Sequence, residues 1–266
     1  MESGDRKVAL VTGASSGIGA AFARRLGRDG YDVVLVARRR QRLECLAAEL
    51  REQHGVGAEV LPADLTNPAD VEWVERRICE LTDLAMLVNS AGFAVFGSFA
   101  ELPVERWLEL LHCHVIASVR FCHAALPHML ARSRGAIINV SSIGGLVPKA
   151  KDATYCATKA YLNMFSQCLQ RELMGTGIRV QALCPGFTDT EFHDDPQYAQ
   201  FKIKERIPKF YWMTAEQVAD LSLKALEKGP VVFVPGFKNR VIVALSRSGL
   251  TDFLLKIMTS FFKNRS

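Results

Sequence analysis

Lys7-Val-Ala-Leu-Val-Thr-Gly-Ala-Ser-Ser-Gly-Ile-Gly19 joins a short apolar run to a glycine-rich turn. The run at 7–12 is typical of a strand buried on both faces, and the segment after the turn has the pattern of a helix up to about residue 30. Glycines spaced G-x-x-x-G-x-G let the backbone turn sharply and approach a pyrophosphate, which then meets the free N–H groups of the helix. The strand-turn-helix context therefore predicts a dinucleotide-binding turn. The cofactor contacts expected here are Gly13, Ser15, Ser16, Gly17, Ile18 and Gly19.

The rest of the chain alternates strand-like and helix-like segments. Strands are expected at 32–37, 58–62, 84–89, 135–141, 177–184 and 230–235, and helices at about 41–54, 68–81, 103–132 and 153–174. This alternation favours an α/β fold with one doubly wound parallel sheet and helices on both faces. Because no stretch resembles a linker, we expect residues 1–266 to form a single domain. Within it, a substrate lid is predicted at about 188–213 and an amphipathic C-terminal helix at about 250–263.

Composition limits the possible classes of protein. A chain of 266 residues that is 49% hydrophobic and 23% charged can bury a large core, which argues against disorder. The net charge of +5 comes without a long Lys/Arg block or a nucleic-acid motif, so no nucleic-acid partner is expected. Seven cysteines without C-x-x-C pairs, an N-terminus that leads directly into a strand and the lack of a spanning apolar run predict a cytoplasmic location.

Three arginines follow the second expected strand. A site for NAD would place an Asp or Glu there to bind the ribose 2′-hydroxyl, whereas this chain has Ala37 and then Arg38-Arg39-Arg40. A guanidinium pairs with a 2′-phosphate, so the sequence favours NADP(H). We assign the phosphate to Arg38 first and to Arg39 second. The alternative is that these arginines are solvated at the end of a strand.

Tyr155-Cys-Ala-Thr-Lys159 places a phenol and an ammonium one helical turn apart on the same face. A neighbouring positive charge favours the phenolate and lowers the pKa of a tyrosine from its usual value near ~10. The pair by itself also fits a solvated lysine beside a half-buried tyrosine. Its significance depends on the other motifs.

Five motifs occur in order: the turn Thr12–Gly19, Asn89-Ser-Ala-Gly92, Ser141-Ser142, Tyr155 to Lys159, and Pro185-Gly186. This set resembles that of the short-chain dehydrogenase/reductase family from residue 12 to about residue 190. The resemblance implies a Rossmann fold and an NADPH-dependent oxidoreductase that reduces a ketone to a secondary alcohol, or runs the reverse oxidation. The alternative from another class is an NADP(H)-binding scaffold or sensor with low turnover. Hydrolysis by Ser142 ranks last, because no G-x-S-x-G elbow surrounds it.

The resemblance also implies roles for individual residues. Tyr155 is the general acid or base, Lys159 lowers its pKa and binds the nicotinamide ribose, and Ser142 holds the substrate oxygen. Further cofactor contacts are implied at Asp64, Leu65, Asn89, Ala91, Gly92, Pro185, Gly186, Thr188 and Thr190.

His114 departs from the family pattern. Many members carry at this position an Asn that links the lysine through water to solvent. A histidine there either relays protons, so that activity survives, or breaks the relay and leaves a slow enzyme. The spacing of His112, His114, His123 and His128 does not suit a metal site, and no metal is expected.

Aromatic and methionine side chains are frequent after Thr190 and at 207–213. They predict an apolar lid suited to a hydrophobic ketone such as an acyl thioester, steroid or polyketide, unless they serve ordinary packing. The apolar face of 250–263 fits subunit packing, a pocket wall or shallow contact with a membrane surface. The resemblance implies a homodimer or homotetramer.

Overall fold

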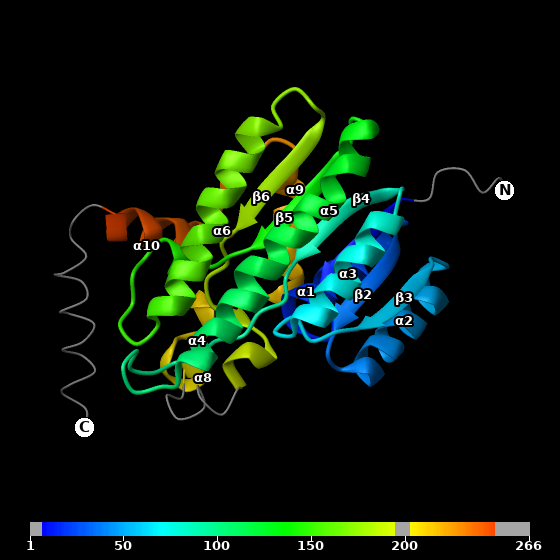
Figure 1. The fold of residues 1–266 in the computed structure, drawn as a ribbon. Coiled ribbons are helices and arrows are strands. Elements are labelled where there is room, and N and C mark those ends of the chain that lie inside the picture. The colour runs from blue at the N-terminus through cyan, green and yellow to red at the C-terminus, as the bar shows by residue number, and fades with distance from the viewer. Residues whose placement is uncertain (1–6, 195–202, 248–266) are drawn as a thin grey trace, which may run out of the picture.

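The fold is built on a parallel sheet. The computed structural model describes residues 7–194 and 203–247, and within them the main sheet has seven strands in the order β3-β2-β1-β4-β5-β6-β9 (Figure 1). The strands are β1 (Val8–Thr12), β2 (Asp32–Ala37), β3 (Ala58–Pro62), β4 (Leu84–Asn89), β5 (Gly135–Val140), β6 (Ile178–Leu183) and β9 (Val232–Phe233). The predicted doubly wound α/β fold is confirmed. The strand order reverses between β1 and β4, and in such sheets the crevice at that point binds ligands.

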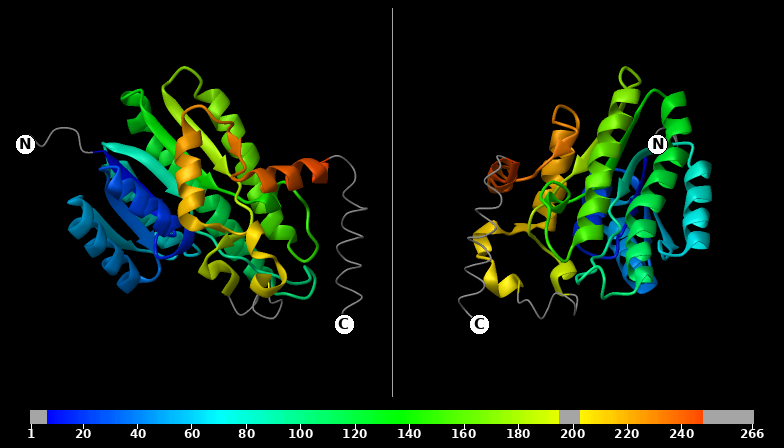
Figure 2. Two further views of the ribbon diagram at one scale, coloured as in Figure 1. Left: turned by 180° about the vertical axis from the view of Figure 1, so that it is seen from behind. Right: turned by 60° about the vertical axis from the view of Figure 1, so that its left-hand side comes forward.

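Helices cover both faces of the sheet (Figure 2). One face carries α1 (Gly17–Arg28), α2 (Arg40–His54) and α9 (Ala215–Leu226), and the other carries α3 (Pro68–Glu80), α5 (Ala117–Ala131) and α6 (Ala153–Glu172). Successive strand residues enter opposite cores: Leu10 packs on the α3/α5 side and Val11 on the α1/α2 side, both fully buried. Each such side chain contributes about 1.5–3 kcal/mol by leaving water.

The helix expected at 103–132 is interrupted by a π-helical turn. It consists of α4 (Val104–Leu111), the π turn η1 (His112–Ile116) and α5, joined without a break in helical backbone. A π turn adds one residue to the helical cycle and therefore shifts the face that the following residues present. Here His114 lies in this turn and is only 1% exposed.

A second, smaller sheet lies beside the carboxyl edge of the main one. The two-residue strands β7 (Thr188–Asp189) and β8 (Met213–Thr214) pair in parallel. No periodicity is readable over two residues, so these strands were not expected from the sequence. The remaining elements are the 3-10 turns η2 (Ile143–Gly145), η3 (Glu191–Asp194) and η4 (Lys209–Tyr211) and the helices α8 (Ile203–Arg206) and α10 (Phe237–Arg247).

Part of the predicted lid and the C-terminal helix cannot be compared with the structure. The lid is described at 188–194 and 203–213, and the expected helix at 250–263 lies outside the described residues. Among the described helices, none combines the length and apolar character needed to cross a bilayer.

Candidate active site

The sequence motifs meet at one edge of the sheet. Parallel pairing sets Thr12 opposite Val36, and Asn89 opposite Asn139. The glycine turn, the arginines after β2 and the loops after β4, β5 and β6 all leave these carboxyl ends. Ligands of open α/β sheets bind at this edge.

The glycine turn packs tightly against the loop after β4. Gly13 has a φ of +69°, and a Cβ on it would lie 2.9 Å from the backbone of Ala91. The hydroxyl oxygen of Thr12 accepts hydrogen bonds from the N–H groups of Ser90 and Ala91 at 3.0 Å each. Any side chain at Gly13 would separate the two loops, which explains the glycine at this position.

The N-terminus of α1 fits a phosphate group. Ser16 is its N-cap residue, but its side chain makes no capping hydrogen bond. Gly17 has a φ of +54°, and a Cβ on Gly19 would collide with the carbonyl oxygen of Gly13. Bare backbone and uncapped N–H groups therefore face the crevice, which is the arrangement that a pyrophosphate requires.

Ser142, Tyr155 and Lys159 come together as the sequence predicted. Ser142 caps η2 and accepts a hydrogen bond from the Gly144 N–H at 3.0 Å, and its side chain lies beside the phenol of Tyr155, whose pKa it lowers. Lys159 is 5% exposed and donates from Nζ to the carbonyl oxygen of Val140 at 2.9 Å. Its Nζ lies 5.7 Å from the centre of the Tyr155 ring.

The electrostatics of this group differ from expectation. Burial raises the pKa of Tyr155 above its ordinary value, and the hydrogen bond with Ser142 lowers it in part. Burial also lowers the pKa of Lys159 to about 8. We expected Lys159 to provide the effect that depresses the pKa of the phenol. In this structure Ser142 provides it, because the ammonium points to Val140.

His114 is held by hydrogen bonds on both ring nitrogens. Thr158 donates its hydroxyl hydrogen to the carbonyl oxygen of Tyr155 at 2.8 Å, so its oxygen must accept from the Nδ1–H of His114, which lies 2.9 Å away. The Nε2 atom then accepts from the N–H of Phe93 at 3.2 Å. This set of bonds fixes one neutral tautomer. Burial, and secondarily the charge of Lys159, hold the pKa of His114 well below its usual 6.5.

The expected proton relay therefore lacks a free nitrogen. Both ring nitrogens of His114 are engaged, Nδ1 with the Thr158 hydroxyl and Nε2 with the Phe93 N–H, so neither is left to pass a proton to Lys159. A Cβ on Gly92 would lie 2.9 Å from Nε2, and the glycine thus allows the imidazole to approach the loop. The geometry makes His114 a tie between the loop after β4 and the helix that carries Tyr155.

The arginine that faces the glycine turn is Arg39. Its guanidinium donates to the hydroxyl oxygen of Ser15 at 3.0 and 3.1 Å and to that of Ser16 at 2.7 Å. Arg38, which we ranked first for the 2′-phosphate, is 66% exposed and lies 3.9 Å from Asp64. Arg39 is the N-cap residue of α2, and its side chain turns back toward the loop. The ranking of the two arginines for the 2′-phosphate stays a prediction.

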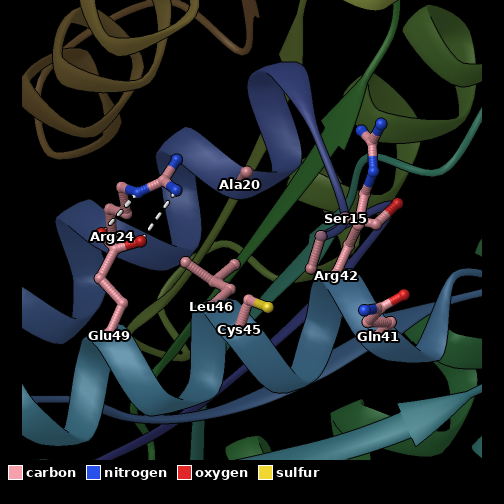
Figure 3. Close-up of a pocket in the computed structure, with 9 residues that line it drawn as sticks. Ser15, Ala20, Arg24, Gln41, Arg42, Cys45, Leu46 and Glu49 are labelled. Atoms are coloured by element: carbon pink, nitrogen blue, oxygen red, sulfur yellow. Dashed lines mark hydrogen bonds and ion pairs between the residues drawn. The ribbon is translucent and has the colours of Figure 1, made fainter.

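Two hollows are bordered by Arg42, which lies on α2 three residues after Arg39. One, of ≈ 310 Å³, lies between α1 and α2, where Ser15 and Arg42 stand at one end and the 2.7 Å ion pair of Arg24 and Glu49 at the other (Figure 3). The second, of ≈ 300 Å³, shares Ser15, Arg24 and Arg42 and continues to Glu191. Polar and basic side chains therefore border space beside the glycine turn.

Three of the predicted cofactor contacts have side chains that are engaged elsewhere. Asn89 is buried and donates to the side-chain oxygen of Asn139 at 2.8 Å. Leu65 is 5% exposed and lies in the core. One carboxylate oxygen of Asp64 accepts from the N–H of Thr66 at 3.0 Å. Asn89 and Leu65 can meet a nucleotide only through their backbone.

The loop after β6 reaches across the site. The N–H of Ile143 donates to the carbonyl oxygen of Pro185 at 3.0 Å, and a Cβ on Gly186 would collide with Asn239. Thr188 donates to the carbonyl oxygen of Gly186 at 3.1 Å. Further along, the methyl carbon of Thr190 would lie 3.0 Å from a Cβ on Gly17, so the lid segment begins directly over the glycine turn.

Aromatic rings line the lid side of Tyr155. The ring of Phe192 lies 6.2 Å from that of Tyr155, and the rings of Phe187 and His193 lie 5.4 and 4.9 Å from that of Trp212. These contacts form one wall of mainly apolar character next to the phenol.

Several functional side chains were missed in the sequence. Arg42 had a readable signal, because it lies on the helix one turn after Arg38 and Arg39. Thr12 and Thr158 lie inside two of the motifs but received no role of their own, and Glu191 and Phe192 had no signal, since their partners are distant in the chain. Within the described residues, no group of His, Cys, Asp and Glu side chains could hold a metal ion.

Residues 7–199 match the family model described as short chain dehydrogenase. The chain belongs to the short-chain dehydrogenase family. It is an oxidoreductase that acts on alcohol and ketone groups. Its cofactor is NADP(H), in agreement with family membership and with the guanidinium of Arg39 beside the glycine turn.

Three similar proteins illustrate the range of this family. A short-chain dehydrogenase from Sphingobium yanoikuyae in complex with NADPH is 36% identical, with a TM-score of 0.81 over 95% of each chain. A bulky-bulky ketone specific alcohol dehydrogenase from Comamonas testosteroni is 32% identical, with a TM-score of 0.77 over 92% of this chain and 94% of the other. A fatty acyl-CoA reductase from Acinetobacter baylyi is 36% identical over 84% of this chain and 74% of the relative.

Proposed function

We propose that this short-chain dehydrogenase reduces a hydrophobic ketone to a secondary alcohol with NADPH, and catalyses the reverse oxidation when alcohol is in excess. The observation that carries the proposal is the contact of Ser142 with the Tyr155 phenol beside buried Lys159. The bound cofactor supplies a hydride to the carbonyl carbon.

Two side chains of the site bind the oxygen of the substrate, and one of them transfers a proton to it. Ser142 and Tyr155 both donate hydrogen bonds to that oxygen, so negative charge developing there meets two fixed donors. Tyr155 transfers its proton to the oxygen during reduction and accepts it back during oxidation. Lys159, whose Nζ is held by the carbonyl oxygen of Val140 and lies 5.7 Å from the centre of the Tyr155 ring, would bind the nicotinamide ribose, the second role that the family resemblance implies.

His114 has a positioning role in this proposal. Through Thr158 it is linked to the backbone carbonyl of Tyr155, and through Phe93 to the loop after β4. The imidazole thus holds the cofactor-binding loop and the catalytic helix in one arrangement. It does so as a neutral ring.

The apolar wall supports a hydrophobic substrate. Phe192 lies against Tyr155, and Phe187 and Trp212 extend the wall away from the phenol. A bulky ketone or a long acyl chain would replace water on these rings. Two similar proteins support the same substrate class: the fatty acyl-CoA reductase from Acinetobacter baylyi and the bulky-bulky ketone specific alcohol dehydrogenase from Comamonas testosteroni.

A kinetic survey tests the proposed reaction. NADPH oxidation is followed with steroid ketones, acetoacetyl thioesters and aryl ketones, with a small polar ketone as the matched comparison. We expect turnover with at least one hydrophobic ketone, and Tyr155→Phe should lower it by about 10²–10⁴-fold while NADPH still binds. NADPH binding without oxidation on any ketone would contradict the proposal and favour a scaffold or sensor.

We also propose that the protein is a homodimer or homotetramer. Apolar side chains gather on the outer faces of α4, η1 and α6, where Leu108, Ile116, Tyr161 and Met164 are between 44% and 62% exposed. Burial of such a face in a second copy would remove it from water. Sedimentation velocity of the full chain tests this, and a monomer at all concentrations would contradict it.

A further inference from the structure

Glu191 connects two arginines that stand beside the glycine turn. One of its carboxylate oxygens accepts a hydrogen bond from Arg39 at 2.8 Å, and the other accepts one from Arg42. Glu191 is the first residue of η3 and follows β7, whereas both arginines come from the start of the second βα unit. Arg39 and Glu191 are 152 residues apart in the chain, so the contact joins distant segments.

The same arginine contacts the residues that line the phosphate side of the crevice. While Arg39 binds Glu191, it also donates to the hydroxyl groups of Ser15 and Ser16. Two guanidinium groups thus bind one anion, and the hydroxyls of Ser15 and Ser16 lie beside it on the guanidinium of Arg39. This donor set suits a phosphate as well as a carboxylate, because both present several oxygens with negative charge. The two arginines hold the pKa of Glu191 below its usual value, so the side chain is an anion at neutral pH.

We propose that Glu191 is an internal substitute for the 2′-phosphate of NADP(H), which must displace the carboxylate from Arg39 and Arg42 to bind. An acid cannot stay between these arginines when a phosphate arrives, because the two anions would repel each other in a shared site. A nucleotide without a 2′-phosphate can bind without displacing the carboxylate. Glu191 thereby lowers the affinity for NADP(H) more than the affinity for NAD(H), and it sets how strongly the enzyme discriminates between the two cofactors.

The position of Glu191 in the chain extends this effect to the lid. Thr190, the preceding residue, packs on Gly17 of the glycine turn, and Phe192, the following residue, lies against Tyr155. Release of the carboxylate by a phosphate therefore acts on the segment that covers both the pyrophosphate turn and the phenol.

Calorimetric titration of the full-length Glu191→Gln variant tests the proposal. The probes are 2′,5′-ADP and 5′-AMP, which differ in the 2′-phosphate and contain no nicotinamide, followed by NADPH and NADH. Removal of the competing charge should raise the affinity for 2′,5′-ADP and NADPH about five- to tenfold, since two exposed ion pairs no longer have to be broken. Binding of 5′-AMP and NADH should change less than about twofold.

A matched variant controls for the change in net charge. Glu44→Gln removes one negative charge from the same helix as Arg42, where Glu44 pairs only loosely with Arg40 at 3.7 Å. It should leave the affinities for all four probes nearly unchanged. Weaker binding of 2′,5′-ADP to Glu191→Gln would show that the carboxylate orients the arginines for phosphate, and equal shifts for both probes would show a general charge effect. Either result overturns the proposal, and neither depends on which ketone the enzyme reduces.

Discussion

The Nδ1 atom of His114 lies 2.9 Å from the hydroxyl oxygen of Thr158, which in turn donates to the backbone of Tyr155. A buried imidazole in the π turn is thus attached to the helix that carries the catalytic phenol. The same ring accepts a hydrogen bond from Phe93 in the loop after β4. Support of the site, rather than proton transfer, follows from this geometry.

The stability of the protein should depend on pH through His114. Its pKa is well below 6.5 in the folded chain, so between the two values the unfolded chain binds a proton that the folded chain does not. The free energy of unfolding should therefore rise with pH in this window, by up to about 1.4 kcal/mol per pH unit. His114→Gln should remove this part of the slope in denaturant titrations between about pH 5 and about pH 6.5.

The kinetics of His114 variants should show whether the imidazole positions the catalytic helix or transfers protons. Glutamine can retain both hydrogen bonds, whereas His114→Leu leaves the N–H of Phe93 without its acceptor and the hydroxyl oxygen of Thr158 without its donor, and should cost about 1–3 kcal/mol of stability. We expect Gln to preserve most turnover and Leu to lower it, with the pH profile of kcat unmoved in both. A profile that shifts in the Gln variant would show that the imidazole carries protons.

Lys159→Met should stabilise the protein while it removes activity. Burial lowers the pKa of Lys159 from 10.5 to about 8, so the fold disfavours the charged form. This penalty is complete below pH 8 and disappears as the pH rises toward 10.5. At neutral pH the variant should gain on the order of 1–3 kcal/mol, less the hydrogen bond to Val140. Lower thermal stability of Lys159→Met would contradict the account.

Ser142→Ala should slow the reaction and change its dependence on pH. The serine supplies the hydrogen bond that lowers the pKa of Tyr155, and its loss lets burial raise that pKa further. Alcohol oxidation needs the phenolate, so its rate should begin to rise at higher pH than in the wild type. Turnover should fall about 10²–10³-fold. A pH profile identical to that of the wild type would place the effect of Ser142 on the substrate alone.

Arg39 and Arg38 should contribute unequally to the choice of cofactor. Arg39→Ala removes the guanidinium beside Ser15 and Ser16 and should weaken NADPH about 10–100-fold, with little effect on NADH. Arg38→Ala should change NADPH affinity less than about threefold, because this side chain points toward Asp64. Equal losses for the two variants in fluorescence titrations would restore the ranking expected from the sequence.

Gly13→Ala should be more damaging than Gly30→Ala. Both glycines have positive φ, +69° and +84°, but only at Gly13 would a Cβ press on the backbone of a neighbouring loop. The first substitution should cost about 2–4 kcal/mol and the second about 1–2 kcal/mol, measured by chemical denaturation. Equal costs would show that the loop after β4 yields to the extra methyl group.

The amino-acid sequence by itself determined the sheet, the glycine turn and the place of Tyr155 and Lys159 one turn apart on one helix. These depend on patterns within one strand or one helical turn, where side-chain direction follows from backbone periodicity. Their agreement with one another identified the family before any contact was known.

Only the tertiary structure decided which groups meet across the chain. Arg39 rather than Arg38 faces the serines because the start of α2 directs its side chain. Glu191 reaches that arginine from 152 residues away, and His114 reaches Thr158 from 44 residues away. No local pattern encodes such contacts, since they arise when the packing of separate elements brings their ends to one edge of the sheet.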